Sequence, residues 1–156
     1  MANGRQFAAI TIGLGIVALA HALVTWPLAA TLALFGGGAV VAFVAEAIVV
    51  TLDWLDHHIG PKLVGVPLYV LFGWTGAVYL AFRAARFAVD GWPAVVVAAA
   101  LATAYDVLTD HQGVADGHWT YVDDLPGPRY RGVPWWNFAG WFVISFLTAA
   151  FALPFL

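Results

Sequence analysis

Three carboxyl groups lie in or at the end of apolar stretches, where a charged side chain is costly. Asp106 and Asp110 are four residues apart near the end of one apolar run, so on a helix they share a face and point into the same volume. Glu46 lies about two turns before the end of another run. Ionisable groups at such depth usually face a bundle interior or a cavity. We therefore predict that Glu46 is a functional residue; the alternative for Glu46 is a structural ion pair or a protonated, hydrogen-bonded acid.

Two chemistries fit these residues and their neighbours. In the first, a neutral carboxylic acid donates a proton to a carbon–carbon double bond, and aromatic faces stabilise the carbocation until water captures it. In the second, carboxylate and imidazole groups hold a metal ion. The candidate ligands for this alternative are Asp56, His57, His58, His111 and His118. Their spacing matches no specific metal motif, so we expect neither a metal nor another cofactor.

The composition indicates that the elements holding these side chains are membrane-spanning helices. Of 156 residues, 63% are hydrophobic and only 10% are charged, and the mean hydropathy is +0.87, whereas soluble domains are about a quarter charged. A span needs roughly 20 apolar residues, which allows about four to six spans in one domain over 1–156. The absence of cysteine excludes disulfides and thiolate chemistry. A net charge of −3 without a basic patch excludes a nucleic-acid partner.

We predict an all-α integral membrane protein with about five transmembrane helices. The expected spans are 7–25, 28–52, 66–87, 93–109 and 134–154. Tryptophan is favoured at membrane interfaces, and five of the eight tryptophans fall at or near these ends: Trp26, Trp54, Trp92, Trp135 and Trp136. The first run follows Arg5, as in a signal peptide, but no small-residue cleavage pattern leads into a polar chain, so we interpret it as a span. Gly36, Gly37 and Gly38 in the second span favour close helix packing over a hinge.

An odd number of spans places the amino terminus and the loops 53–65 and 110–133 on one membrane face. That face carries four of the six basic residues, which favours an inside amino terminus. The four are Arg5, Lys62, Arg129 and Arg131. Arg83 and Arg86 lie towards the other face.

A sequence pattern occurs twice, G-P-x-x-x-G-V-P followed by x-x-x-x-x-G-W. It begins at Gly60 and again at Gly127, and every matched pair is 67 positions apart, including Trp74 and Trp141. The same offset relates Asp56 to Asp123. We predict a parallel internal repeat of two-helix units, about 28–87 and 93–154, whose acidic loops open on one face and build one site. The alternative is that both segments are simply well-formed helix starts.

The residues of the second unit also resemble a known family. The motifs are Asp106-x-x-x-Asp110, Trp119-x-Tyr121 and Tyr130-x-Gly132-Val133-Pro134-x-x-Asn137-Phe138-x-Gly140-Trp141. They are similar to those of the membrane carotenoid hydratases, a family that includes bisanhydrobacterioruberin hydratase and carotenoid 1′,2′-hydratase. The resemblance covers roughly residues 40–150. The chain differs from that family in its short, charged segment 53–58 and at His111, where the family commonly has proline.

The resemblance implies an enzyme that adds water to the terminal double bond of an acyclic carotenoid, without redox chemistry or a metal. It implies that Asp106, Asp110 and Glu46 supply the acid and position water. It further implies substrate-binding side chains around the end group: Trp119, Tyr121, Asn137, Trp141, Trp74 and Tyr130. We accordingly expect a multi-pass protein of the cell membrane that contacts lipids, a carotenoid or other isoprenoid, and other membrane enzymes of that pathway. A non-catalytic carotenoid- or lipid-binding protein is the remaining alternative.

Overall fold

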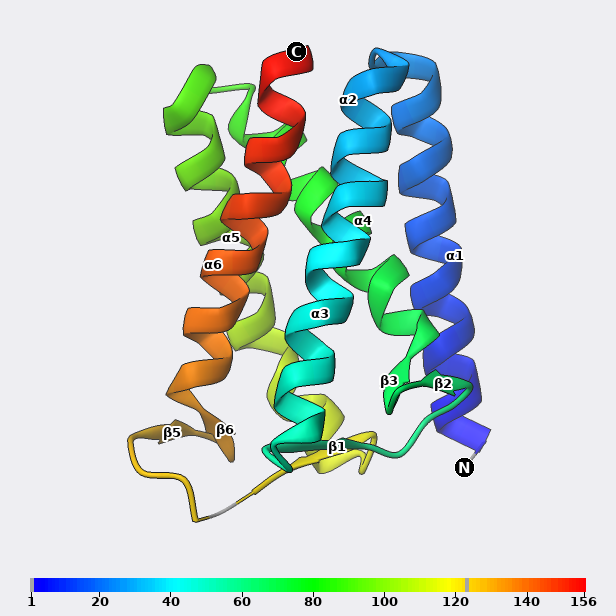
Figure 1. Cartoon of the computed structure of the whole chain (residues 1–156), viewed down its shortest axis with the longest axis vertical. Helices are drawn as coiled ribbons and strands as arrows, with labels where there is room; N and C mark the ends of the chain where they lie inside the picture. The colour runs from blue at the N-terminus through cyan, green and yellow to red at the C-terminus, as the bar shows by residue number, and fades with distance from the viewer. Residues whose placement is uncertain (1, 123) are drawn as a thin grey trace.

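Five helical spans form the body of the protein. The computed structural model describes residues 2–122 and 124–156, so Asp123, half of the predicted acidic pair, lies outside the described residues. The spans are Gly4–Thr25, Leu28–Thr51, Leu68–Ala85, Gly91–Ala115 and Trp135–Phe155, and each is long and apolar enough to cross a membrane. Figure 1 shows them running along the long axis of the molecule. The prediction of an all-α membrane bundle with five spans is confirmed.

The helices are α1 (Ala2–Thr25), α2 (Leu28–Leu32), η1 (Ala33–Gly37), α3 (Gly38–Thr51), α4 (Leu68–Ala85), α5 (Gly91–Ala115), α6 (Trp135–Ala152) and η2 (Leu153–Phe155). The strands are β1 (Leu55–His57), β2 (Lys62–Leu63), β3 (Val66–Pro67), β4 (Trp119–Tyr121), β5 (Arg129–Tyr130) and β6 (Val133–Pro134). The second span comprises α2, the π-helical turn η1 and α3. The strands lie with the amino terminus at one end of the bundle, and the carboxyl terminus lies at the other (Figure 1). The two acidic loops therefore share one end, as an odd number of spans requires.

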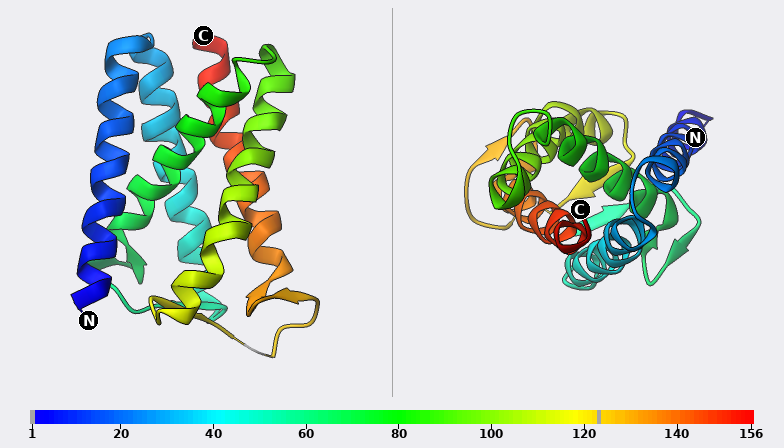
Figure 2. Two further views of the ribbon diagram at one scale, coloured as in Figure 1. Left: turned by 180° about the vertical axis from the view of Figure 1, so that it is seen from behind. Right: turned by 90° about the horizontal axis from the view of Figure 1, so that it is seen from above.

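Helix α4 is the most buried of the five spans. It crosses the bundle obliquely between α1 and α5, as Figure 2 shows from behind. Its side chains Val78, Tyr79 and Phe82 are fully buried, and alanines of the neighbouring helices pack around them. Small residues let the helix backbones approach closely, which is the usual means of helix association in lipid. This arrangement places the start of α4 at the same end as the acidic loops.

Glycines make two of the helix contacts possible. A Cβ on Gly15 of α1 would lie 2.6 Å from the backbone oxygen of Phe72 on α4. A Cβ on Gly38 of α3 would lie 2.5 Å from a methyl carbon of Thr148 on α6. In the glycine run of the second span, Gly37 and Gly38 lie at close contacts with α6, whereas no atom lies within 4 Å of a Cβ on Gly36. The π turn η1 ends at Gly37 within the continuous span.

Helix α5 differs from its predicted span. It extends to Ala115, so the prediction that the span ends at 109 and that Asp110 begins a loop is wrong. Hydropathy marks where apolar residues stop, whereas the helix continues through polar residues and stops only before Gly117, whose φ is +69°.

Trp26 is not an exposed tryptophan at the membrane interface. Its side chain is only 7% exposed and packs against Tyr79 and Phe82.

The two Gly-Val-Pro segments adopt the same local structure. In β2–β3, Leu63 pairs with Val66, and in β5–β6, Tyr130 pairs with Val133. The N–H of the first residue of each following helix donates at 3.0 Å to a proline carbonyl, Leu68 to Pro61 and Trp135 to Pro128. Val64 and Arg131 both have φ of +50°. The matched turns agree with the predicted internal repeat, and the duplication itself stays a prediction.

Candidate functional site

The two acidic loops meet as an antiparallel pair of strands. In β1 and β4, Leu55 pairs with Tyr121, Asp56 with Thr120 and His57 with Trp119. Beyond the strands, the N–H of His58 donates to the carbonyl of His118 at 2.8 Å. The pairing brings together loops that are more than sixty residues apart in the chain and makes a cover over one end of the bundle.

A cavity of about 330 Å³ lies beneath this cover. All three candidate acids line it: Glu46 from α3, and Asp106 and Asp110 from α5. Asp106 is 3% exposed and Asp110 is 7% exposed. The structure thus places the three carboxyl groups in one small, largely buried volume, although they come from helices separated by more than fifty residues.

Each aspartate of the pair accepts a hydrogen bond from a different element. Asn137 Nδ2, in the first turn of α6, donates to Asp106 Oδ2 at 2.9 Å. The hydroxyl of Tyr121 on β4 donates to Asp110 Oδ2, also at 2.9 Å. Asn137 therefore contacts one of the acids directly.

The phenol of Tyr121 is held in its protonated form. Its pKa is raised well above the usual value, first because the ring is buried and then because Asp110 and Asp106 repel a phenolate. Tyr121 consequently remains a hydrogen-bond donor to Asp110 across the neutral range of pH.

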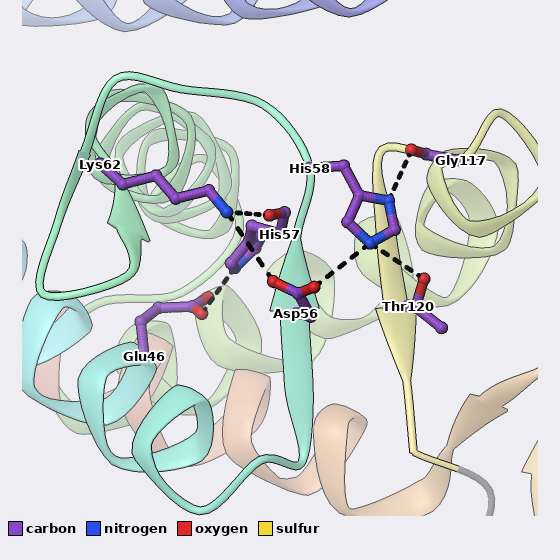
Figure 3. Close-up of polar contacts among 7 residues, drawn as sticks. All are labelled: Glu46, Asp56, His57, His58, Lys62, Gly117 and Thr120. Carbon is purple, nitrogen blue, oxygen red and sulfur yellow. Dashed lines mark hydrogen bonds and ion pairs between the residues drawn. The ribbon is translucent and has the colours of Figure 1, made fainter.

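Glu46 has a buried partner that the sequence reasoning assigned only to the metal alternative. Its Oε2 lies 3.1 Å from His57 Nε2, and the two side chains are 11% and 5% exposed. His57 is held in turn by Lys62, whose ammonium group donates to the His57 carbonyl (Figure 3). Nδ1 of His57 is buried and has no hydrogen-bond partner among the described residues. A fixed acid–imidazole pair is an arrangement that can position water or relay a proton.

Aromatic rings form much of the rest of the wall. The indoles of Trp74 and Trp141 are stacked, with ring centroids 4.0 Å apart and planes inclined by 13°. Both line the cavity, together with Trp119 and Tyr121. The stacked pair joins the two predicted repeat units, because these tryptophans occupy equivalent positions in the repeated pattern.

Tyr130 does not belong to this wall. The structure places it in the β5–β6 turn, 44% exposed, with its ring beside His111 and under the guanidinium of Arg131. Its pairing partner Val133 is fully buried, so the two side chains of this pair differ in exposure, which the motif alone does not indicate.

Other cavity residues were missed by sequence reasoning. Tyr69, at the start of α4, is 4% exposed, and its buried hydroxyl has no partner among the described residues. Phe7 and Thr11 of α1 also line the cavity, and the Phe7 ring lies 4.6 Å from that of His118. The position of Tyr69 after Gly-Val-Pro-Leu was the available signal, whereas nothing in the sequence of α1 indicated a cavity wall.

Of the alternative metal ligands, His57 and His118 line the acid cavity, whereas Asp56, His58 and His111 do not. Within 2–122 and 124–156, no group of three or more His, Asp or Glu side chains is arranged to hold a metal ion. His58 lies 3.6 Å from Asp56 and also contacts Gly117 and Thr120 (Figure 3). His111 lies instead against Arg131. The geometry favours the acids over these histidines as the chemical centre.

Comparison with known proteins agrees with the geometry at the family level. The family model described as "carotenoid biosynthesis protein" matches residues 7–155, almost the whole chain. No curated protein and no solved structure matches the chain. The matched region contains every residue of the cavity wall named above. The chain belongs to the carotenoid biosynthesis protein family.

Proposed function

We propose that this protein is a hydratase that adds water to the terminal carbon–carbon double bond of an acyclic carotenoid in the cell membrane. The observation that carries the proposal is that Glu46 and the buried Asp106 and Asp110 line one cavity together with aromatic rings. Protonating an alkene needs a positioned acid, and the resulting cation is stabilised by ring faces. The family supports a role in carotenoid biosynthesis.

In the proposed mechanism, Asp110 is the acid and Tyr121 orients it. The Asp110 carboxyl gives its proton to the less substituted carbon of the double bond, whose π electrons form the new C–H bond and leave a tertiary cation on the other carbon. The Tyr121 hydroxyl, fixed on Asp110 Oδ2, holds the carboxyl in place during this step. Trp119 and the stacked Trp74 and Trp141 line the cavity, and in this proposal their rings stabilise the cation.

Water capture completes the reaction on the other side of the acid pair. A water molecule forms the C–O bond to the cation, and its excess proton passes to the carboxylate of Asp106, which Asn137 orients. Glu46 and His57 border the same cavity and position this water. Transfer of the proton from Asp106 to Asp110, one helical turn away, restores the starting state. The reaction thus adds one water molecule to the double bond, regenerates the acid and needs no redox partner.

The direct test is co-expression with a pathway that makes an acyclic carotenoid, followed by mass analysis of the pigment. We expect the product to gain one water molecule with the unaltered protein and with Asp53→Asn. Asp53 is exposed at the end of α3 and has φ of +57°, which asparagine adopts readily, so it is a matched control for loss of one carboxyl.

Asp110→Asn removes the proposed acid and keeps the shape of the side chain. We expect hydration to fall by at least about a hundredfold, the usual range for a general acid, while the protein still accumulates in the membrane. Unchanged hydration in Asp110→Asn would exclude this residue as the acid. If carotenoid co-purifies with the unaltered protein but never gains water, the protein is a binding module rather than an enzyme.

A further inference from the structure

A second cavity, of about 360 Å³, lies at the end of the bundle opposite to the acids. Its wall combines the turn between α1 and α2 with the end of α4, and includes Thr25, Trp26, Arg83, Arg86 and Phe87. It shares no wall residue with the acid cavity. We propose that this second cavity binds the phosphate headgroup of an anionic membrane lipid.

Among the described residues that line the cavity, two carry a guanidinium group and none carries an acidic side chain. Arg83 and Arg86 are three residues apart on α4, so both side chains lie on one face of the helix. Nε of Arg86 lies 3.7 Å from Oδ1 of Asp90, a side chain that is 84% exposed. Arg83 makes no hydrogen bond or ion pair with any residue in the described ranges. Guanidinium groups match the geometry of phosphate oxygens, so the pair offers one free donor group and one weakly held one.

The position of the cavity favours a lipid, rather than a dissolved anion, as its ligand. It lies where α1 ends at Thr25 and α4 ends at Ala85, which is the level at which headgroups meet the apolar part of a membrane. Phe87, beside the arginines, is 86% exposed. A lipid can place its phosphate on the guanidinium groups and its acyl chain against this ring, whereas a free anion would use only the charges.

A purely structural role for the arginines makes a different prediction. Basic side chains in the last turn of a helix stabilise it through the helix dipole, and Arg83 lies in the last turn of α4. That role would lower stability when the arginines are removed, but it would give no preference for one headgroup over another. Headgroup selectivity therefore separates the two explanations.

The experiment is native mass spectrometry of the purified full chain with equal amounts of phosphatidylglycerol and phosphatidylcholine. Both lipids carry a phosphate, but only the first has a net negative charge. We expect retention of phosphatidylglycerol over phosphatidylcholine. Surface arginines each contribute about fivefold to binding of anionic lipid, so Arg83→Gln combined with Arg86→Gln should weaken that retention by about tenfold or more.

The matched control is Arg5→Gln combined with Arg131→Gln, which removes two exposed cations from the opposite end. This control should keep the selectivity, and Arg83→Lys with Arg86→Lys should keep part of it, which separates lost binding from misfolding. Three results would overturn the proposal: equal retention of both lipids, unchanged selectivity in the double glutamine variant, or equal loss in the control. Displacement of phosphatidylglycerol by inorganic phosphate at millimolar concentration would also overturn it, because the site would then recognise a free anion.

Discussion

Each of the three buried carboxyl groups is held by one side chain from another element. Asn137 of α6 contacts Asp106, Tyr121 of β4 contacts Asp110, and His57 of β1 contacts Glu46. The orientation of the acids is therefore determined by the loops and by α6 as well as by their own helices. Disturbing a partner should impair the chemistry while leaving the acid in place.

Tyr121→Phe tests this dependence with the loss of a single oxygen. The variant removes the donor to Asp110 Oδ2 and retains the ring. A hydrogen bond of this kind contributes about 1 kcal/mol, so we expect hydration to fall by about fivefold with a small change in stability. Because the pKa of Tyr121 is raised by burial, the phenol keeps its proton, and the loss relative to the unaltered protein should be constant from about pH 6 to pH 9.

The measurement is hydrated carotenoid formed by membranes at several pH values. A loss that disappears towards pH 9 would contradict the assignment of a protonated donor. Tyr130→Phe is the matched control, since Tyr130 is 44% exposed outside the cavity wall, and it should retain full activity.

At this scale the sequence predicts the acids but not their partners. Glu46, Asp106 and Asp110 stand out because carboxyl groups are rare in apolar runs. The contact of His57 with Glu46 depends on where β1 crosses the end of α3, and no local pattern encodes that crossing. The motif likewise does not predict the position of Tyr130, which lies in the β5–β6 turn and does not line the cavity.

At the scale of elements, the contact of α1 with α4 depends on a glycine. Gly15→Ala would bring a methyl group to 2.6 Å from the Phe72 carbonyl oxygen, a backbone atom that cannot rotate away. We expect a loss of about 1–3 kcal/mol in the free energy of unfolding, as for overpacked interiors. The readout is the denaturation midpoint of the protein in detergent.

Gly13→Ala is the matched control on the same helix. No atom lies within 4 Å of a Cβ at that position, and alanine favours a helix over glycine, so stability should be unchanged or slightly higher. Equal destabilisation by both substitutions would show that the effect arises from helix composition rather than from the α1–α4 contact.

The five spans were predictable because length and hydropathy alone identify apolar helices. The end of α5 was not, since Asp110, His111 and Gln112 are polar and yet helical, and the helix stops at the positive φ of Gly117. The pairing of β1 with β4 could not be predicted from local sequence patterns either. Its register joins residues more than sixty positions apart, and three-residue strands carry no detectable alternation.

At the scale of the whole molecule, the β1–β4 pair connects the two halves of the chain. Asp56 and Thr120 are directly opposite each other, and opposed Cα atoms in such ladders are about 5.5 Å apart, within the range of a disulfide. The chain has no cysteine, so Asp56→Cys with Thr120→Cys creates a single pair. We expect it to form a disulfide under mild oxidation in membranes, measured by mass and by the migration of a chain cleaved between the two positions.

Asp90→Cys with Thr120→Cys places the thiols at opposite ends of the bundle and should remain reduced. Absence of the disulfide in the first pair under conditions that oxidise exposed thiols would mean that the loops do not meet. The outcome is independent of catalytic activity, so it tests the arrangement of the halves by itself.

The stacked Trp74–Trp141 pair has a consequence for the ancestry of the protein. Under the predicted duplication, a single ancestral unit meeting a second copy of itself would have placed the same tryptophan on both sides of the contact, so a symmetric dimer would have had this stack before the genes fused. The acids do not follow that symmetry: the position equivalent to Glu46 is Gly113, where a Cβ would lie 2.0 Å from the Trp119 ring. Under that prediction, the first unit has a carboxyl group where the second has a glycine against an aromatic ring, a difference that two identical subunits encoded by one gene could not have.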